Sequence, residues 1–200
     1  MKAAHWILRS ISNIAGTEVF FGVSGANIED LFHAAAGKGV LAKHEFGAAC
    51  MADAYARVSG KLGVVLATSG GGALNLAPGL AESFASRVPV LALVGQPPLG
   101  LEGTGAFQET SGKAGTFPLE AVYAPLTKYC RKLTDISELP QALEAAINAA
   151  ITAPQGPVVL ILPKDLQQKE LEVPCLARVA APVEASVHPF SRLALAEKLK

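Results

Sequence analysis

The fold is decided by residues 40–75, whose sequence is VLAKHEFGAACMADAYARVSGKLGVVLATSGGGALN. Residues 40–42 form a short apolar run typical of a strand, and Glu45–Ser59 carries small apolar residues at helical spacing. Gly63–Ala67 is an entirely apolar strand pattern, and residues 72–86 continue as a second helix after three consecutive glycines. This order of strand, helix, strand and helix predicts parallel strands joined by crossover helices.

The same alternation continues in both directions along the chain. Further strands are expected at residues 18–22, 89–94, 127–131 and 157–162, and further helices at 3–15, 27–36 and 137–153. Because the strands are continuous apolar runs, we expect both faces of the sheet to be covered. The predicted fold class is α/β, a doubly wound and mainly parallel sheet with helices on both faces. Residues 99–120 are rich in glycine and without a period, so a long loop is expected there.

The character of the chain changes after the last predicted strand. Residues 164–185 are first charged and then rich in proline and alanine, which is typical of a linker. We therefore expect one domain at residues 1–165, an interdomain linker at 166–190, and the start of a truncated central domain at 191–200.

Composition narrows the class of partner. Half of the 200 residues are apolar, and the 17 Lys and Arg residues balance the 17 Asp and Glu residues. This balance favours neither nucleic acid nor a membrane surface as a partner, and leaves a small molecule or another protein. The three cysteines (Cys50, Cys130 and Cys175) form no CxxC pair, and no signal peptide or apolar run of membrane-spanning length is present. A reduced, cytoplasmic location is expected.

Four turns between strands and helices carry the residues that could perform chemistry. Glu45 opens a helix, and three small-residue loops occupy residues 22–27 (GVSGAN), 68–75 (TSGGGALN) and 103–109 (GTGAFQE). Each feature by itself also has an ordinary explanation, as a helix-start acid or a tight turn, and the triple glycine could instead contact a nucleotide. Together they meet at the carboxyl edge of one sheet, which predicts a ligand site there.

Three of these four features resemble those of a known family. Residues 43–75, KHEFGAACMADAYARVSGKLGVVLATSGGGALN, are similar to a stretch containing RHE…A…A.GYAR.TGK.GV….SGPG.TN in thiamine-diphosphate (ThDP) enzymes of the acetolactate synthase branch. GTGAFQE is similar to the G.DAFQE of the same enzymes. The resemblance runs from about residue 3 to 166, and it implies the pyrimidine-binding (PYR) domain of a 2-oxo acid decarboxylase or carboligase.

The resemblance implies a catalytic role for Glu45. Its counterpart hydrogen-bonds N1′ of the aminopyrimidine ring and favours the imino tautomer, whose 4′-nitrogen deprotonates thiazolium C2 for attack on a 2-oxo acid. Gln108 matches a second catalytic residue, a glutamine that reaches the reaction centre from the partner's loop. The other matched positions are cofactor-binding (Val23, Ser24, Gly25, Thr68, Gly71 and Asn75) or on the substrate side (Ala26 and Phe107).

The chain departs from the family pattern at four places near the substrate. Ser24 and Gly71 replace prolines, Leu74 replaces a threonine, and Gly105 replaces the aspartate before Ala-Phe-Gln. The substrate and product therefore stay open, and the sequence does not decide whether the complete enzyme binds FAD.

The family binds the cofactor's diphosphate through Mg²⁺ on a second domain, with a Gly-Asp-Gly motif that these 200 residues lack. The chain alone is therefore expected to be inactive, and the enzyme to be a homodimer or homotetramer with its cofactor between subunits. A free-standing or split-subunit domain that binds a partner without catalysis is the alternative. A nucleotide-binding α/β domain is a third hypothesis.

Two helices are also expected to form a self-association surface, because they are rich in small and apolar residues. The positions are Ala48, Ala49, Ala52 and Ala56 in one helix and Ala73, Leu76, Leu80 and Ala81 in the other. Cys50 lies among the same small residues, and a buried thiol is expected.

Overall fold

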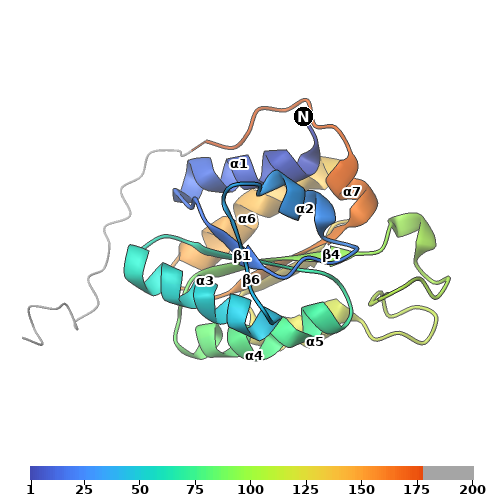
Figure 1. Ribbon diagram of the computed structural model, residues 1–200, viewed down its shortest axis with the longest axis horizontal. Coiled ribbons are helices and arrows are strands. Elements are labelled where there is room, and N and C mark those ends of the chain that lie inside the picture. Colours follow the sequence, from blue (N-terminus) through green and yellow to red (C-terminus); the bar gives the residue numbers. More distant parts are fainter. Residues whose placement is uncertain (178–200) are drawn as a thin grey trace, which may run out of the picture.

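The computed structural model describes residues 1–177 and consists of a parallel sheet between two layers of helices (Figure 1). The six strands have the order β2-β1-β3-β4-β6-β5, and every neighbouring pair is parallel. Their bounds are β1 (Phe20–Gly22), β2 (Gly39–Leu41), β3 (Gly63–Ala67), β4 (Val90–Gln96), β5 (Tyr129–Lys132) and β6 (Val158–Pro163). The predicted fold class is confirmed.

Each face of the sheet has its own helix layer and its own apolar core. One layer contains α1 (Ala3–Ala15), α2 (Glu29–Ala34), α6 (Leu139–Ile151) and α7 (Lys164–Gln168) (Figure 1). The opposite layer contains α3 (Glu45–Ser59), α4 (Gly71–Ala85) and α5 (Leu119–Tyr123). Three short 3₁₀ turns complete the fold, at Leu99–Leu101, Ala124–Leu126 and Ile136–Glu138. Because both faces are covered, β3 and β4 are buried at every position.

Helices α3 and α4 pack closely because their contact is made of small residues. A Cβ atom added to Gly79 of α4 would lie 2.5 Å from the Cβ of Ala49. On the sheet side of α3, a Cβ atom added to Gly63 of β3 would lie 2.2 Å from the carbonyl oxygen of Ala52. Seven of the eight residues predicted for self-association are buried in this core, and Ala81 is half-buried. That assignment was wrong, because helical spacing of small residues equally suits a close contact within one chain.

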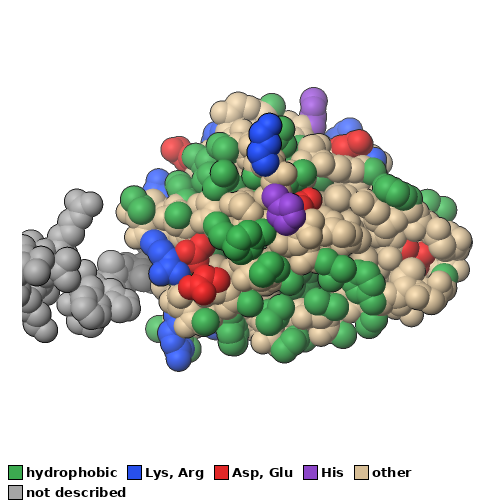
Figure 2. All heavy atoms as spheres, turned by 60° about the horizontal axis from the view of Figure 1, so that its bottom comes forward, with side chains coloured by type: hydrophobic (Ala, Val, Ile, Leu, Met, Phe, Trp, Pro, Cys, Tyr) green, Lys and Arg blue, Asp and Glu red, His purple; other side chains and the backbone are tan. Residues whose placement is uncertain are grey.

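The outer face of the same two helices is nevertheless apolar (Figure 2). Its large exposed side chains are Phe46, Met51 and Val58 on α3 and Leu74 and Phe84 on α4. Val58 is 89% exposed, which makes it the most exposed of these residues. Cys50 is also exposed, so the expectation of a buried thiol was wrong.

Two helices were not predicted, α5 at the end of the long loop and α7 at the start of the expected linker. The chain after α7 runs along α1, where Ala3 N donates to Lys169 O at 2.8 Å and Trp6 Nε1 donates to Val173 O at 3.0 Å. Leu176 N donates to Ser10 Oγ at 3.0 Å. Residues 166–176 of the expected linker therefore lie against the domain. The rest of that linker and the expected central-domain start, residues 178–200, lie outside the described residues.

No helix within residues 1–177 is long and apolar enough to cross a membrane.

Candidate functional site

Four loops meet at the carboxyl edge of the sheet, because they follow β1, β2, β3 and β4, which are all parallel. These are the loop at residues 23–28, the segment at 42–44 that leads into α3, the turn at 68–70 and the long loop at 97–118. The expectation that Glu45, Gly25, Thr68, Gly71 and Gln108 share one edge of the sheet is confirmed. Their chemical roles stay predictions.

Glu45 is the first residue of α3 and is only 8% exposed. His44 caps this helix, and its Nδ1 accepts a hydrogen bond from Phe46 N at 3.2 Å. The Glu45 Oε2 atom accepts a hydrogen bond from Asn75 Nδ2 at 3.0 Å. Within residues 1–177, Oε1 accepts no hydrogen bond and no basic side chain pairs with this carboxylate. A buried carboxylate with a single protein partner leaves an acceptor for a ligand.

Glycines let the backbone approach this carboxylate closely. A Cβ atom on Gly72 would lie 3.1 Å from Glu45 Oε1 and 2.8 Å from Thr68 Cγ2. A Cβ atom on Gly25 would lie 2.7 Å from Thr68 Cβ. Gly71 is exposed and has no atom within 4 Å of its Cβ position, so the entrance to this space is open. Gly25 and Gly72 form a cradle that added Cβ atoms would fill, and the buried Glu45 carboxylate lies beside it.

The loop after β1 is tied to the turn after β3 by a residue that was not predicted, Asn27. Its backbone N donates to Thr68 Oγ1 at 3.2 Å, and its Nδ2 donates to Ser69 Oγ at 2.7 Å. Its carbonyl oxygen accepts from Gln167 Nε2 of α7 at 2.8 Å. Asn27 belongs to the loop motif and could have been found there. Gln167 lies 140 positions away in an expected linker, and nothing local marks it.

The remaining positions of that loop line the rim of the site. Val23 is half-buried, whereas Ser24 and Ala26 are exposed. The carbonyl oxygen of Ala26 accepts a hydrogen bond from Lys164 Nζ at 2.7 Å, and the same ammonium pairs with Glu29 at 3.0 Å. Helix α7 thus holds this loop from outside the site.

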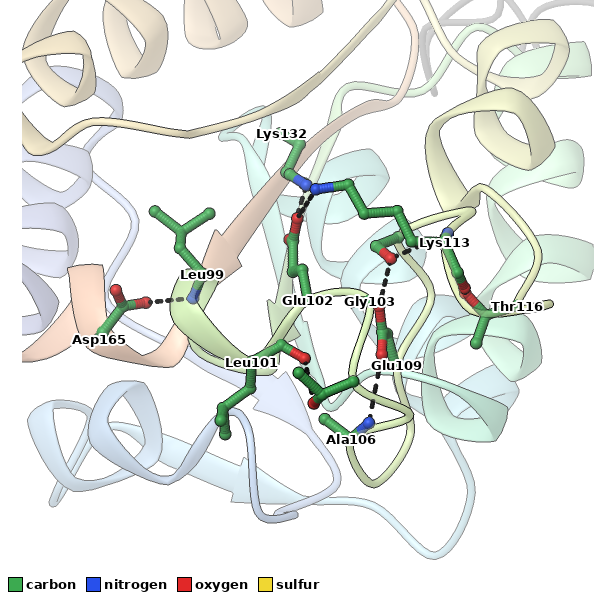
Figure 3. A network of polar contacts seen from close by, with 12 residues as sticks. Leu99, Leu101, Glu102, Gly103, Ala106, Glu109, Lys113, Thr116, Lys132 and Asp165 are labelled. Atoms are coloured by element: carbon green, nitrogen blue, oxygen red, sulfur yellow. Dashed lines mark hydrogen bonds and ion pairs between the residues drawn. The ribbon is translucent and has the colours of Figure 1, made fainter.

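The long loop brings Gln108 to the same place (Figure 3 shows the network that supports this loop). Thr68 Oγ1 is 3.4 Å from Gln108 Oε1, and a Cβ atom on Gly70 would lie 2.9 Å from Gln108 Cβ. The glutamine that the resemblance puts on a partner's loop therefore lies at the Thr68 turn of its own chain. Phe107 is 75% exposed, so it does not form a wall within this chain.

The described residues offer a site for an organic group rather than for a metal. Across residues 1–177, no three His, Cys, Asp or Glu side chains come close enough together to hold a metal ion. Glu45, Asn75 and Gln108 instead supply one carboxylate and two amides around a glycine-lined space. Such a set can bind the polar edge of a flat ring, and the carboxylate can exchange a proton with a ring nitrogen.

Comparison with known proteins agrees with this geometry. Residues 1–114 match the family model described as thiamine pyrophosphate enzyme, N-terminal TPP binding domain. The chain is 37% identical over 176 residues to the acetolactate synthase large subunit of Corynebacterium glutamicum, with 86% of this chain and 27% of that protein covered. It is 36% identical over 194 residues to the probable acetolactate synthase large subunit of Methanocaldococcus jannaschii, with 91% and 30% covered.

The chloroplastic acetolactate synthase of Arabidopsis thaliana is 36% identical over 176 residues, which cover 86% of this chain and 25% of that protein. The chain thus spans between a quarter and a third of the length of these relatives.

Proposed function

Because this chain belongs to the thiamine pyrophosphate enzymes, as an N-terminal TPP binding domain of the acetolactate synthase-like kind, we propose that it binds the aminopyrimidine ring of ThDP against Glu45 and activates the cofactor there. The observation that carries the proposal is the buried Glu45 carboxylate, which accepts one hydrogen bond within residues 1–177 and is approached closely by the backbone at Gly72. Both features suit a flat ring with a nitrogen at its edge.

In this proposal Glu45 exchanges a proton with the ring nitrogen N1′, and burial keeps water from competing for the carboxylate. Asn75 orients the carboxylate through its 3.0 Å hydrogen bond. Val23, Ser24 and Gly25 cover one side of the ring, and Thr68 and Gly71 line the other. When bound, ThDP supplies the carbon centre that attacks the carbonyl group of a 2-oxo acid. Gln108, with Ala26 and Phe107 at the rim, faces that substrate.

The complete enzyme is then a 2-oxo acid decarboxylase or carboligase whose diphosphate and Mg²⁺ are held by another domain. We propose residues 1–165 as its PYR domain, 166–190 as a linker whose first part packs against that domain, and 191–200 as the start of the central domain. A homodimer or homotetramer is proposed, because Phe46, Met51 and Val58 leave an apolar outer face on α3 that a second subunit can cover. A cytoplasmic location fits the three cysteines, none of which forms a disulfide.

The electrostatics of the triple glycine disfavour a nucleotide phosphate. The Cβ position of Gly72 faces the Glu45 carboxylate at 3.1 Å, and that carboxylate is buried without a paired cation in the described part of the chain. A phosphate at this turn would meet a like charge in a poorly solvated place.

The test is to fill the space beside Glu45 with one methyl group. Gly72→Ala places that group 2.8 Å from Thr68 Cγ2 and 3.1 Å from the Glu45 carboxylate, whereas Gly47→Ala, in the first turns of α3, has no atom within 4 Å of its Cβ position. In the complete enzyme with Mg²⁺, we expect Gly72→Ala to weaken ThDP binding at least about fivefold, since overpacking costs about 1–3 kcal/mol. Gly47→Ala should stay within about twofold, well under the roughly 1.4 kcal/mol that a tenfold change requires. Equal affinities in a calorimetric titration would contradict the proposal.

A further inference from the structure

A second buried carboxylate, that of Glu109, lies next to the proposed site and belongs to the long loop itself. Glu109 is 5% exposed and directly follows Gln108. Its carboxylate accepts backbone hydrogen bonds from Gly103 at 2.6 Å, Gly105 at 3.1 Å and Ala106 at 3.2 Å (Figure 3). The hydroxyl of Ser111 donates a fourth. The loop is therefore folded around one side chain.

The backbone of the loop is adapted to this arrangement. Gly103 has φ +86° and Gly105 has φ +77°, a region that glycine adopts without a steric penalty. Successive N–H groups that converge on one anion form a concave anion site, which here is filled by the chain's own carboxylate. The Ser111 hydroxyl and these backbone N–H groups hold the pKa of Glu109 below its usual value, so the side chain is ionised at neutral pH.

Gln108 has a strained backbone at this point. Its φ is +60°, one of three positive values among non-glycine residues of the described chain. Such a backbone conformation persists where contacts of the chain before and after the residue hold it in place. Before Gln108, the Glu109 carboxylate binds residues 103–106. After it, Thr110 Oγ1 donates to the buried Gln96 Oε1 at 2.6 Å, which ties the loop to the end of β4.

We propose that Glu109 is a positioning residue of the site, whose carboxylate folds residues 103–111 and so holds the Gln108 amide beside Thr68. This rests on the proposed function, in which Gln108 faces the substrate. Glu109 itself points into its own loop, so it positions substrate-side groups without touching the cofactor. Its loss should therefore impair use of the 2-oxo acid and leave ThDP affinity unchanged.

The first arm of the test measures the loop directly, by amide hydrogen exchange in the full chain. Glu109→Gln keeps the size of the side chain, but it replaces one acceptor oxygen with an N–H₂ donor that faces backbone N–H groups. We expect exchange at Gly105 and Ala106 to accelerate at least about tenfold, which is a change of roughly 1.4 kcal/mol in the opening free energy.

Glu102→Gln is the matched control for the exchange measurement. Glu102 lies in the same loop and its side chain is buried, but that side chain pairs with Lys132 Nζ at 2.6 Å and Lys113 Nζ at 3.5 Å rather than with these backbone N–H groups. It should leave exchange at Gly105 and Ala106 unchanged. Unaltered exchange in Glu109→Gln would overturn the proposal at this stage.

The second arm asks whether Glu109 acts through Gln108, by a double-mutant cycle in the complete enzyme. We expect Glu109→Gln to lower kcat/KM for the 2-oxo acid about tenfold while ThDP affinity stays within about twofold. In a Gln108→Ala background, the same change should lower kcat/KM by less than about twofold, because residues that act as a unit are not additive.

Additive losses, or a parallel loss of ThDP affinity, would overturn the positioning role. A wild-type enzyme that shows no ThDP-dependent turnover would instead overturn the proposed function, and the exchange arm would still report on the loop.

Discussion

Replacing Glu45 with glutamine separates a chemical role of this side chain from a structural one. Glutamine has nearly the same shape and can still accept the hydrogen bond from Asn75 that Glu45 Oε2 accepts at 3.0 Å. It cannot exchange a proton with a ring nitrogen. The change therefore removes the charge and the proton-transfer capacity and keeps the packing of a residue that is 8% exposed.

The effect on stability is small by this reasoning. Loss of the charge-assisted part of the Asn75 hydrogen bond costs about 1 kcal/mol. Loss of a negative charge at the first turn of α3 costs about 0.3–1 kcal/mol. Removal of a buried charge offsets part of both terms. A net change of about 1 kcal/mol corresponds to a shift in Tm of about 2–4 °C for a domain of this size.

The proposed role predicts a much larger effect on the activation of the cofactor than on the stability of the fold. General acid–base contributions are about 10²–10⁴-fold, which is roughly 3–5 kcal/mol of barrier. We expect the exchange of the C2 proton of bound ThDP for deuterium, measured in the complete enzyme, to slow by that factor in Glu45→Gln. A thermal melt of the same sample should show only the small shift.

Glu120→Gln is the control: Glu120 also lies in the first turn of a helix and within residues 1–177 also accepts a single hydrogen bond, from Lys132 N at 2.9 Å, but it is exposed and distant from the site in sequence. It should leave C2 exchange unchanged. Exchange in Glu45→Gln within a few-fold of the wild-type rate would show that Glu45 does not activate the cofactor, and the central proposal would be wrong.

Four further predictions concern the fold and its surface. The 200-residue chain by itself should bind ThDP weakly with or without Mg²⁺, because residues 1–177 contain no cluster of metal ligands; tight, Mg²⁺-dependent binding in a calorimeter would contradict this. Gly79→Ala should destabilise the fold by about 1–3 kcal/mol, because its Cβ would lie 2.5 Å from that of Ala49, and a denaturant titration with an unchanged midpoint would be the opposite result. Burial raises the pKa of Cys130 to about 12, so this thiol should resist iodoacetamide at pH 8, whereas the exposed Cys50 should react. Partial desolvation, together with Asp53 and Glu82, raises the pKa of the exposed Cys50 thiol, so its reaction should accelerate as the pH rises. Self-association through α3 should slow that reaction, and rates that do not depend on protein concentration would count against this interface.

The order of strands and helices and the place of the site could be predicted because their signals are local. The predicted bounds Glu45–Ser59 and Gly63–Ala67 are those of α3 and β3. Both elements could be predicted because small residues at helical spacing and a continuous apolar strand are patterns of neighbouring residues. Parallel strands then bring the turns after them to one edge, so Glu45, Thr68 and Gly25 could be placed together before any coordinates were known.

Only the tertiary structure decided which surfaces these elements use. Alanines at helical spacing on α3 are compatible with a core or with a subunit interface, and it is the close approach of α4 that makes them core and leaves Phe46 and Val58 outside. The hydrogen bond from Gln167 to Asn27 and the left-handed Gln108 beside the Glu109 carboxylate had no signal in the sequence. Such contacts depend on residues far apart in the chain or on a backbone conformation that local propensity disfavours, so they exist only once the packed sheet imposes them.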